Sequence, residues 1–98
     1  MPYLIETWDK PEHAAVRQEN RPAHLAWLEE NKARLLACGA KMDDAGQAAQ
    51  GSFYIVDVDA RADAERFIAA DPFTLAGLPA RVAITRWRLA FLDRRSYL

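Results

Sequence analysis

The order of strand-like and helix-like segments is the feature that most constrains the fold of this chain. The clearest strand is G-S-F-Y-I-V-D-V (51–58), in which five of the eight residues are aromatic or β-branched. Alternation, apolar spacing and turn residues predict the remaining elements: strands at 2–8, 40–44 and 80–91, and helices at 12–20, 22–37 and 60–70. This order predicts an α+β, ferredoxin-like βαββαβ fold, with the helices covering one face of a four-stranded antiparallel sheet.

Proline, glycine and aspartate mark the expected ends of the helices. Pro22 discourages α geometry at Arg21, so the helical region after the first strand is expected to be interrupted there. Gly39 fits the C-terminal end of the second helical segment, and Asp59 can cap the start of the third.

The second face of such a sheet would have no cover within the chain. With 98 residues the sequence is expected to form one domain, 1–98. The first and last strands nevertheless carry large side chains on both sides, among them Leu4, Trp8, Trp87 and Phe91. Because soluble monomers avoid large exposed apolar patches, we expect a homodimer in which two sheets pack face to face.

Charge and composition argue against several classes of partner. Thirteen Lys and Arg against fourteen Asp and Glu leave a net charge of −1, which gives no basic footprint for nucleic acid or an anionic membrane. The N-terminus lacks the pattern of a signal peptide, and no apolar run approaches the ~20 residues of a membrane span. We therefore expect a cytoplasmic protein. Cys38, the single cysteine, excludes an intramolecular disulfide and is expected to be a packed or surface thiol.

His24 is the first candidate for chemistry. At ~100° per residue, Leu28 and Leu35 lie within ~40° of it on the helix, so the imidazole heads the apolar stripe. One interpretation is a core histidine satisfied by a backbone carbonyl. The other is a general acid or base, since an imidazole titrates close to neutral pH. His13, which lies among exposed-looking Glu12 and Arg17, is expected at the surface.

Asp71 lies in the connector A-D-P-F-T-L-A-G-L (70–78), which is longer than a bare helix-to-strand link requires. Asp followed by Pro is a sound N-cap and N1 pair, so Asp71 can simply start a short helix at Pro72. Alternatively, one carboxylate oxygen caps the backbone while the other receives the ring N–H of His24 and fixes its tautomer. Spacing alone leaves both interpretations open.

Other polar residues give weaker indications. Arg21 precedes His24 by three positions and could hold an anionic substrate, or it could be an exposed arginine paired with Glu19. Ser52, at the start of the strand 51–58, is a candidate substrate contact, and the alternative is that its hydroxyl only satisfies a strand end. Two histidines and one cysteine without ligand spacing make a metal site unexpected, and no nucleotide or cofactor motif is present. The aromatic residues are expected in the core or at a dimer contact: Trp27, Tyr54 and Trp87.

Three segments together resemble the YCII-related family: R-P-A-H-L-A-W-L (21–28), A-G-Q-A-A-Q-G-S-F-Y-I-V (45–56), and A-D-P-F-T-L-A-G-L (70–78) followed by I-T-R-W (84–87). The resemblance implies a dimeric α+β barrel and a cleft containing a His–Asp pair, which maps onto His24 and Asp71. It also implies chemistry like that of a relative that dehydrochlorinates a chlorinated hydroxyquinol. Related barrels include muconolactone isomerases and small monooxygenases. The C-terminal end, F-L-D-R-R-S-Y-L (91–98), lies outside these motifs.

Two functions follow as hypotheses. The first is a cofactor-free enzyme in which His24, oriented by Asp71, moves a proton during isomerisation or elimination of a small anionic compound. Arg21 would hold the negative charge, and Trp27 and Phe73 would form apolar walls. The second is a non-catalytic dimer that binds a small ligand, with a structural His–Asp hydrogen bond. A haem-degrading or other oxidative barrel is a weaker third hypothesis.

Overall fold

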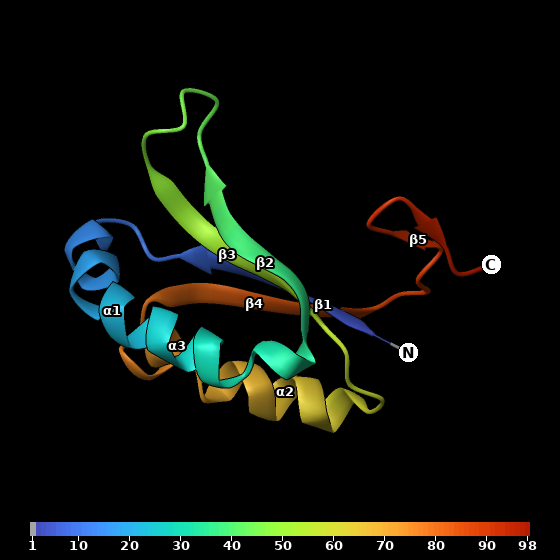
Figure 1. Cartoon of the computed structure of the whole chain (residues 1–98). Coiled ribbons are helices and arrows are strands. Elements are labelled where there is room, and N and C mark those ends of the chain that lie inside the picture. The colour runs from blue at the N-terminus through green and yellow to red at the C-terminus, as the bar shows by residue number, and fades with distance from the viewer. Residues whose placement is uncertain (1) are drawn as a thin grey trace.

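The computed structural model describes residues 2–98 and has the predicted α+β, ferredoxin-like fold. Four antiparallel strands are arranged in the order β2-β3-β1-β4, and the helices lie together on one side of the sheet (Figure 1). The strands of the sheet are β1 (Tyr3–Asp9), β2 (Leu35–Met42), β3 (Ala49–Val56) and β4 (Pro79–Arg86). The helices are α1 (Ala14–Glu30), η1 (Lys32–Arg34), α2 (Arg61–Ala69) and α3 (Pro72–Leu75).

The core forms where the central strands meet α2. Alternate residues of β1 point to the helices, so Tyr3 and Ile5 are buried. Ile5 pairs with Tyr54 of β3, which is buried on the same face. Helix α2 supplies the facing layer through Ala64, Phe67 and Ile68, as their spacing predicts. No helix of residues 2–98 has the length and apolar character needed to cross a membrane.

Helix α1 is continuous through Pro22, so the predicted interruption is wrong. A proline inside a helix removes a backbone hydrogen bond and strains the preceding turn. Here Pro22 lies on the exposed side of α1, while Arg17 and His24 are buried on either side of it in the sequence. Contacts made by both buried residues therefore hold the two halves of the helix in one line.

The predicted end of this helix near residue 37 is also wrong. Helix α1 ends at Glu30, and the side chain of Asn31 donates a 2.8 Å hydrogen bond to the carbonyl oxygen of Trp27 in the last turn. The chain then forms η1 and enters β2 at Leu35, so Gly39 lies inside a strand. Pairing with β3 gives this segment backbone hydrogen bonds and partial burial that override its helical pattern.

Two smaller boundaries differ from expectation. The N-cap of α2 is Ala60 rather than Asp59, and Ala60 makes no side-chain capping bond. Strand β4 ends at Arg86, short of the predicted residue 91. The chain then forms a small hairpin from β5 (Phe91–Leu92) and β6 (Arg95–Ser96), which lies away from the helices in Figure 1. Asp93 and Arg94, both with positive φ, make its turn.

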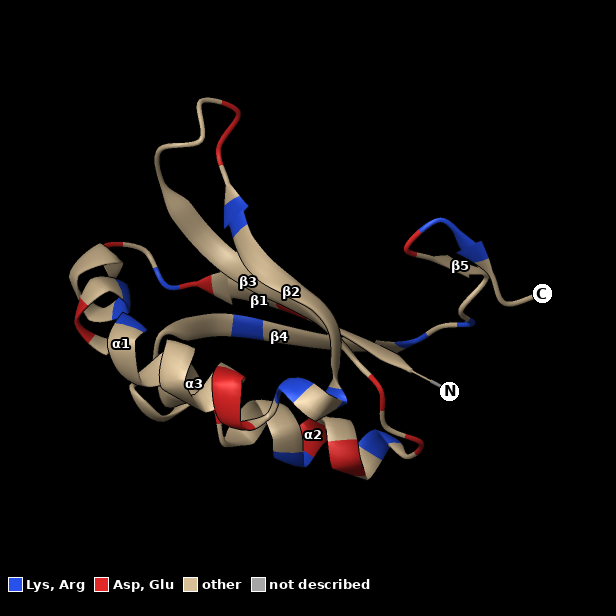
Figure 2. Cartoon of the chain, in the orientation of Figure 1, with Lys and Arg blue, Asp and Glu red and all other residues tan. Residues whose placement is uncertain are grey.

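The sheet face opposite the helices carries both apolar and charged groups. Phe53 remains 37% exposed there, and no helix within residues 2–98 covers it. Lys41 and Arg81 lie over the ring of Trp8, with their charged groups 3.8 and 4.4 Å from the ring centre. On the helical side, acidic and basic residues are intermixed along α2 (Figure 2).

Candidate active site

His24 and Asp71 are in direct contact, as predicted. His24 comes from the middle of α1, and Asp71 is the N-cap of α3. Nδ1 of the imidazole lies 2.8 Å from Oδ1 of the carboxylate. The Asp71 side chain is fully buried, and only 9% of the His24 side chain is exposed. The pair therefore lies at the boundary between the core and solvent.

The capping and histidine-binding interpretations of Asp71 both hold. Oδ1 accepts from the backbone N–H of Phe73 at 2.9 Å as well as from His24, whereas one oxygen for each partner was expected. Oδ2 is left to accept a 2.6 Å hydrogen bond from the hydroxyl of Tyr54. A buried carboxylate requires such partners, and these three join α1, β3 and α3 at one point.

Tyr54 is a member of this cluster that the sequence predicted only as a core or dimer contact. Its ring is buried on the helical face of β3. Burial, followed by the negative charge of Asp71, raises the pKa of the Tyr54 phenol well above its usual range. The hydroxyl therefore remains a donor to Asp71 at all ordinary pH values.

The other edge of the His24 ring is left available. Phe73 stacks on the imidazole with 3.9 Å between ring centres and 13° between planes. Nδ1 faces the Asp71 carboxylate, so a neutral imidazole carries its N–H on Nδ1 and donates it to Asp71. The lone pair of that neutral ring is then on Nε2. No residue among 2–98 forms a hydrogen bond with Nε2. The geometry thus leaves one imidazole nitrogen free to accept a proton.

A cavity of about 260 Å³ adjoins His24 between α1 and the strands β2 and β3. It brings together four predicted site residues, namely Arg21, His24, Ser52 and Phe73. The remaining lining residues are Arg17, Leu25, Leu28, Cys38, Gly39, Ala40 and Tyr54. Trp27 does not line it and packs on Phe67, with 4.6 Å between ring centres.

Cys38 brings a thiol to the wall of this cavity. Cys38 is an exposed residue, but the loss of part of the water around its thiol and, secondarily, the negative charge of Asp71 raise the pKa of the thiol. The thiol therefore ionises less readily than an ordinary cysteine. Within residues 2–98, no three His, Cys, Asp or Glu side chains gather as metal ligands would.

Arg17 is the main site residue that sequence reasoning missed, because it was expected to be exposed. Its guanidinium is buried and donates to both carboxylate oxygens of Asp9, from Nε at 2.7 Å and from Nη2 at 3.2 Å. Nη2 also donates to Oγ of Ser52 at 3.0 Å. Ser52 is thus part of a polar network on the cavity wall and does more than close a strand end.

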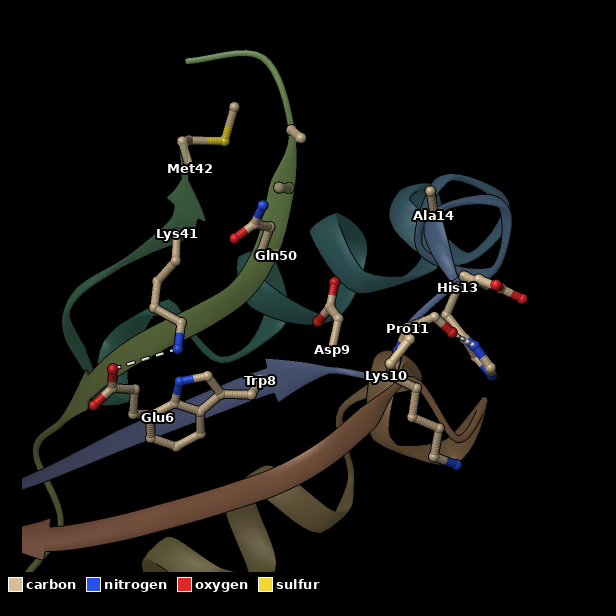
Figure 3. A pocket seen from close by; sticks show the side chains of 13 residues that line it. Glu6, Trp8, Asp9, Lys10, Pro11, His13, Ala14, Lys41, Met42 and Gln50 are labelled. Atoms are coloured by element: carbon tan, nitrogen blue, oxygen red, sulfur yellow. Dashed lines mark hydrogen bonds and ion pairs between the residues drawn. The ribbon is translucent and has the colours of Figure 1, made fainter. Parts of the chain in front are cut away.

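A larger cavity, of about 710 Å³, lies at the end of the sheet between the β2–β3 hairpin and the β1–α1 loop (Figure 3). Trp8, Lys41 and Asp9 contribute to its wall. Nδ1 of His13 is occupied by a 2.8 Å hydrogen bond with the carbonyl oxygen of Pro11, which fixes that ring at the cavity rim. Asp9 lines the larger cavity, and its ion-pair partner Arg17 lines the one at His24.

Comparison with known proteins identifies the family. The family model of the YCII-related domain matches residues 1–88. The chain belongs to the YCII-related family. Two curated relatives, both named Protein YciI, from Escherichia coli O6:H1 and Shigella flexneri, are each 32% identical over 98 residues. Each match covers 93% of this chain and 100% of the relative.

A solved structure of similar fold comes from Burkholderia phenoliruptrix AC1100. It is 5-chloro-2-hydroxyhydroquinone dehydrochlorinase (TftG) in complex with 2,5-dihydroxybenzoquinone. The two chains are 35% identical, and the match covers 90% of this YCII-related protein and 94% of TftG with a TM-score of 0.84. A member of the same fold group therefore binds a small ring compound and removes chloride from one.

Proposed function

We propose that this YCII-related protein is a small, cofactor-free enzyme in which His24 moves a proton during elimination or isomerisation of a small anionic ring compound. The observation that carries the proposal is the placement of His24. A buried carboxylate orders one imidazole nitrogen, and the other nitrogen is left available beside a cavity. Such a positioned general base contributes roughly 10²–10⁴-fold to a reaction rate.

A single general base such as His24 suits dehydrochlorination. In a chlorinated hydroxyquinol the ring first tautomerises, so that a proton moves from one hydroxyl oxygen to the carbon that carries chlorine. Nε2 of His24 then accepts a proton from a second hydroxyl, the chloride leaves with the electrons of its bond to carbon, and the double bonds of a quinone form. One proton and one chloride ion are lost, so no oxidant or reductant is consumed. Asp71 keeps the ring in the orientation and tautomer that present Nε2, and the charge of Asp71 stabilises the imidazolium that forms.

The size of the cavity favours a small substrate. At about 260 Å³ it lies near the lower limit for ligand pockets, which suits a single aromatic or lactone ring. Phe73 supplies an apolar wall, Arg21 and Ser52 supply polar contacts, and Trp27 supports the site through Phe67. We take the substrate of TftG as the first compound to test.

The proposal includes a homodimer, acting in the cytoplasm, that is built from single-domain protomers. The sheet face carrying Phe53 and Trp8 would be covered by the same face of a second copy. The His24 cavity lies on the helical side of the sheet, so each protomer would hold its own site.

A second function is supported by the way Asp71 joins three elements. If the cluster is purely structural, the protein is a non-catalytic dimer that binds a small ligand. Both functions require the contact between His24 and Asp71, and they differ only in whether turnover occurs.

The deciding experiment measures chloride release from 5-chloro-2-hydroxyhydroquinone under anaerobic conditions, which suppress autoxidation. We expect release by the wild type and its loss, by at least 10²-fold, in His24→Gln with an unchanged circular dichroism spectrum. Lys32→Gln, a change on the exposed turn after α1, is the control and should retain full activity. Full activity in His24→Gln would disprove the proton-transfer role. Binding of 2,5-dihydroxybenzoquinone without turnover of this compound or of related chlorophenols and lactones would favour the binding protein.

A further inference from the structure

Arg17 is a buried charged residue on the wall of the His24 cavity. The proposed proton transfer by His24 does not itself require this charge. Only 9% of the residue is exposed. A buried guanidinium is costly unless it is paired, and Asp9 and Ser52 provide that pairing. These partners also fix the orientation of the group, because a bidentate contact with a carboxylate leaves a planar fork little freedom.

The pairing leaves part of the guanidinium unused. Asp9 and Ser52 occupy Nε and Nη2. Among residues 2–98, no group accepts a hydrogen bond from Nη1. Two N–H donors of a fixed cation are therefore available at a cavity that Arg17 lines.

Phe73 fixes the placement of this cation relative to His24. The imidazole stacks on the Phe73 ring with 3.9 Å between ring centres, and the Arg17 guanidinium lies over the same ring, 4.7 Å from its centre. The spacing agrees, because positions 17 and 24 are two helical turns apart on the same side of α1. The cation and the base thus both contact one aromatic ring.

We propose that Arg17 binds the ionised oxygen of the ligand through Nη1 and selects ring compounds with an acidic oxygen at one end and the exchangeable proton at the other. This inference rests on the proposed function, because it assigns the charged end of the same substrate. A ligand lying along the edge of Phe73 would reach both groups, as a single six-membered ring with polar groups at opposite positions can. Arg21 lines the same cavity but is exposed, so water screens its charge.

The test compares an acidic and a neutral ring of similar size. The acidic probe is 2,5-dihydroxybenzoquinone, and the neutral probe is benzene-1,4-diol; binding of each to the full-length protein is measured by calorimetry and NMR. The main variant is Arg17→Gln combined with Asp9→Asn, so that no buried charge is left unpaired. Asp63→Asn with Arg66→Gln removes an exposed ion pair from α2 and serves as the matched control.

We expect the wild type to bind the acidic probe at least tenfold more tightly than the neutral one. The Arg17 and Asp9 double variant should weaken binding of the acidic probe at least tenfold and change binding of the neutral probe less than threefold. The control should change neither by more than threefold. Circular dichroism verifies that each variant is folded. If the double variant unfolds, Arg17→Lys with Asp9 unchanged replaces it. Arg17→Lys should weaken binding of the acidic probe and leave binding of the neutral probe unchanged.

Three results would overturn the inference. These are no binding of the acidic probe by the wild type at millimolar concentration, equal affinity for the two probes, and an effect of Arg21→Gln as large as that of the Arg17 variant. The proposed reaction fails separately. Loss of chloride release in His24→Gln together with equal affinity for the two probes would remove only the role of Arg17. Acid-selective binding without turnover would remove only the enzyme.

Discussion

The hydroxyl of Tyr54 donates a 2.6 Å hydrogen bond to Oδ2 of Asp71, opposite the oxygen that meets His24. The carboxylate is thereby held from both sides, by a strand on one and by a helix on the other. Its orientation relative to the imidazole depends on the packing of the whole cluster, so the stability of the core and the geometry of the site are linked.

Tyr54 should make the protein less stable above pH 10. An unfolded tyrosine ionises near pH ~10, whereas burial and the charge of Asp71 raise the pKa of Tyr54 in the folded protein. Between these values unfolding releases a proton, so the free energy of unfolding falls as the pH rises, by up to ~1.4 kcal/mol per pH unit. Below pH 10 the full contribution of the phenol is retained. Urea unfolding between pH 8 and 11 measures the slope.

Comparison of variants separates Tyr54 from other groups that titrate in alkali. Tyr54→Phe should remove the contribution of this phenol to the pH dependence of the unfolding free energy. Tyr97→Phe, at an exposed position just after the C-terminal hairpin, should leave that dependence unchanged. If Tyr54→Phe and the wild type have the same slope, the phenol is not held in its neutral form by this environment.

The contact between His24 and Asp71 could be anticipated, but the environment that holds it could not. The apolar stripe of the helix and the family motif pointed to these two residues. Arg17 was missed because a break was expected at Pro22, which placed positions 17 and 24 on separate helices. In a continuous helix they lie ~20° apart, so an inward His24 implies an inward Arg17. The packing that keeps the helix continuous is tertiary and leaves no local signal.

The role of Tyr54 shows a different limit of sequence reasoning. Alternation along β3 places Tyr54 on the same face as Ser52, and both are buried there. That pattern predicts burial but says nothing of the hydroxyl. The partner of the hydroxyl depends on where the connector after α2 lies in space. Fold class and strand parity thus follow from the sequence, whereas a three-way hydrogen-bond network depends on the packed structure.

Asp71→Asn should lower stability more than it alters shape. The amide has nearly the volume of the carboxylate but no negative charge. Only its oxygen accepts hydrogen bonds, so it cannot accept from all three donors that the two carboxylate oxygens serve. We expect a loss of about 1–3 kcal/mol, typical of leaving a buried polar group unsatisfied. Urea unfolding at pH 7 measures it. Asp57→Asn, at an exposed position after β3, should change stability by less than ~0.5 kcal/mol. Equal stability of the two variants would show that the cluster contributes little.

Cys38 should react slowly with alkylating agents, and Asp71 should be part of the reason. Partial burial and the charge of Asp71 raise the pKa of the thiol, so less thiolate is present at pH 8 than in an ordinary cysteine. Asp71→Asn removes the negative charge, lowers the thiol pKa and should accelerate labelling by iodoacetamide several-fold. Mass spectrometry follows the reaction. Asp93→Asn in the C-terminal turn is the charge-matched control, and unchanged labelling in a folded Asp71→Asn protein would contradict the electrostatic cause.

Gly51 is the position where the sheet should tolerate a side chain least. A Cβ placed there would lie 2.2 Å from the carbonyl oxygen of Thr7 and 2.6 Å from Cε of Lys41. The lysine can move, but the carbonyl belongs to the neighbouring strand β1, so the two central strands would have to separate. We expect Gly51→Ala to destabilise the protein by about 1–3 kcal/mol or more.

A second glycine of the same sheet provides the control for this effect. A Cβ on Gly39, in edge strand β2, would meet nothing closer than Cε1 of Phe53 at 4.0 Å. Gly39→Ala should therefore change the urea midpoint little. Adding Lys41→Ala to Gly51→Ala should restore little stability, because the backbone clash remains. Restoration by this change would mean that the lysine, and not the strand, sets the requirement for glycine. Equal stability of the two alanine variants would show that the sheet yields at this point.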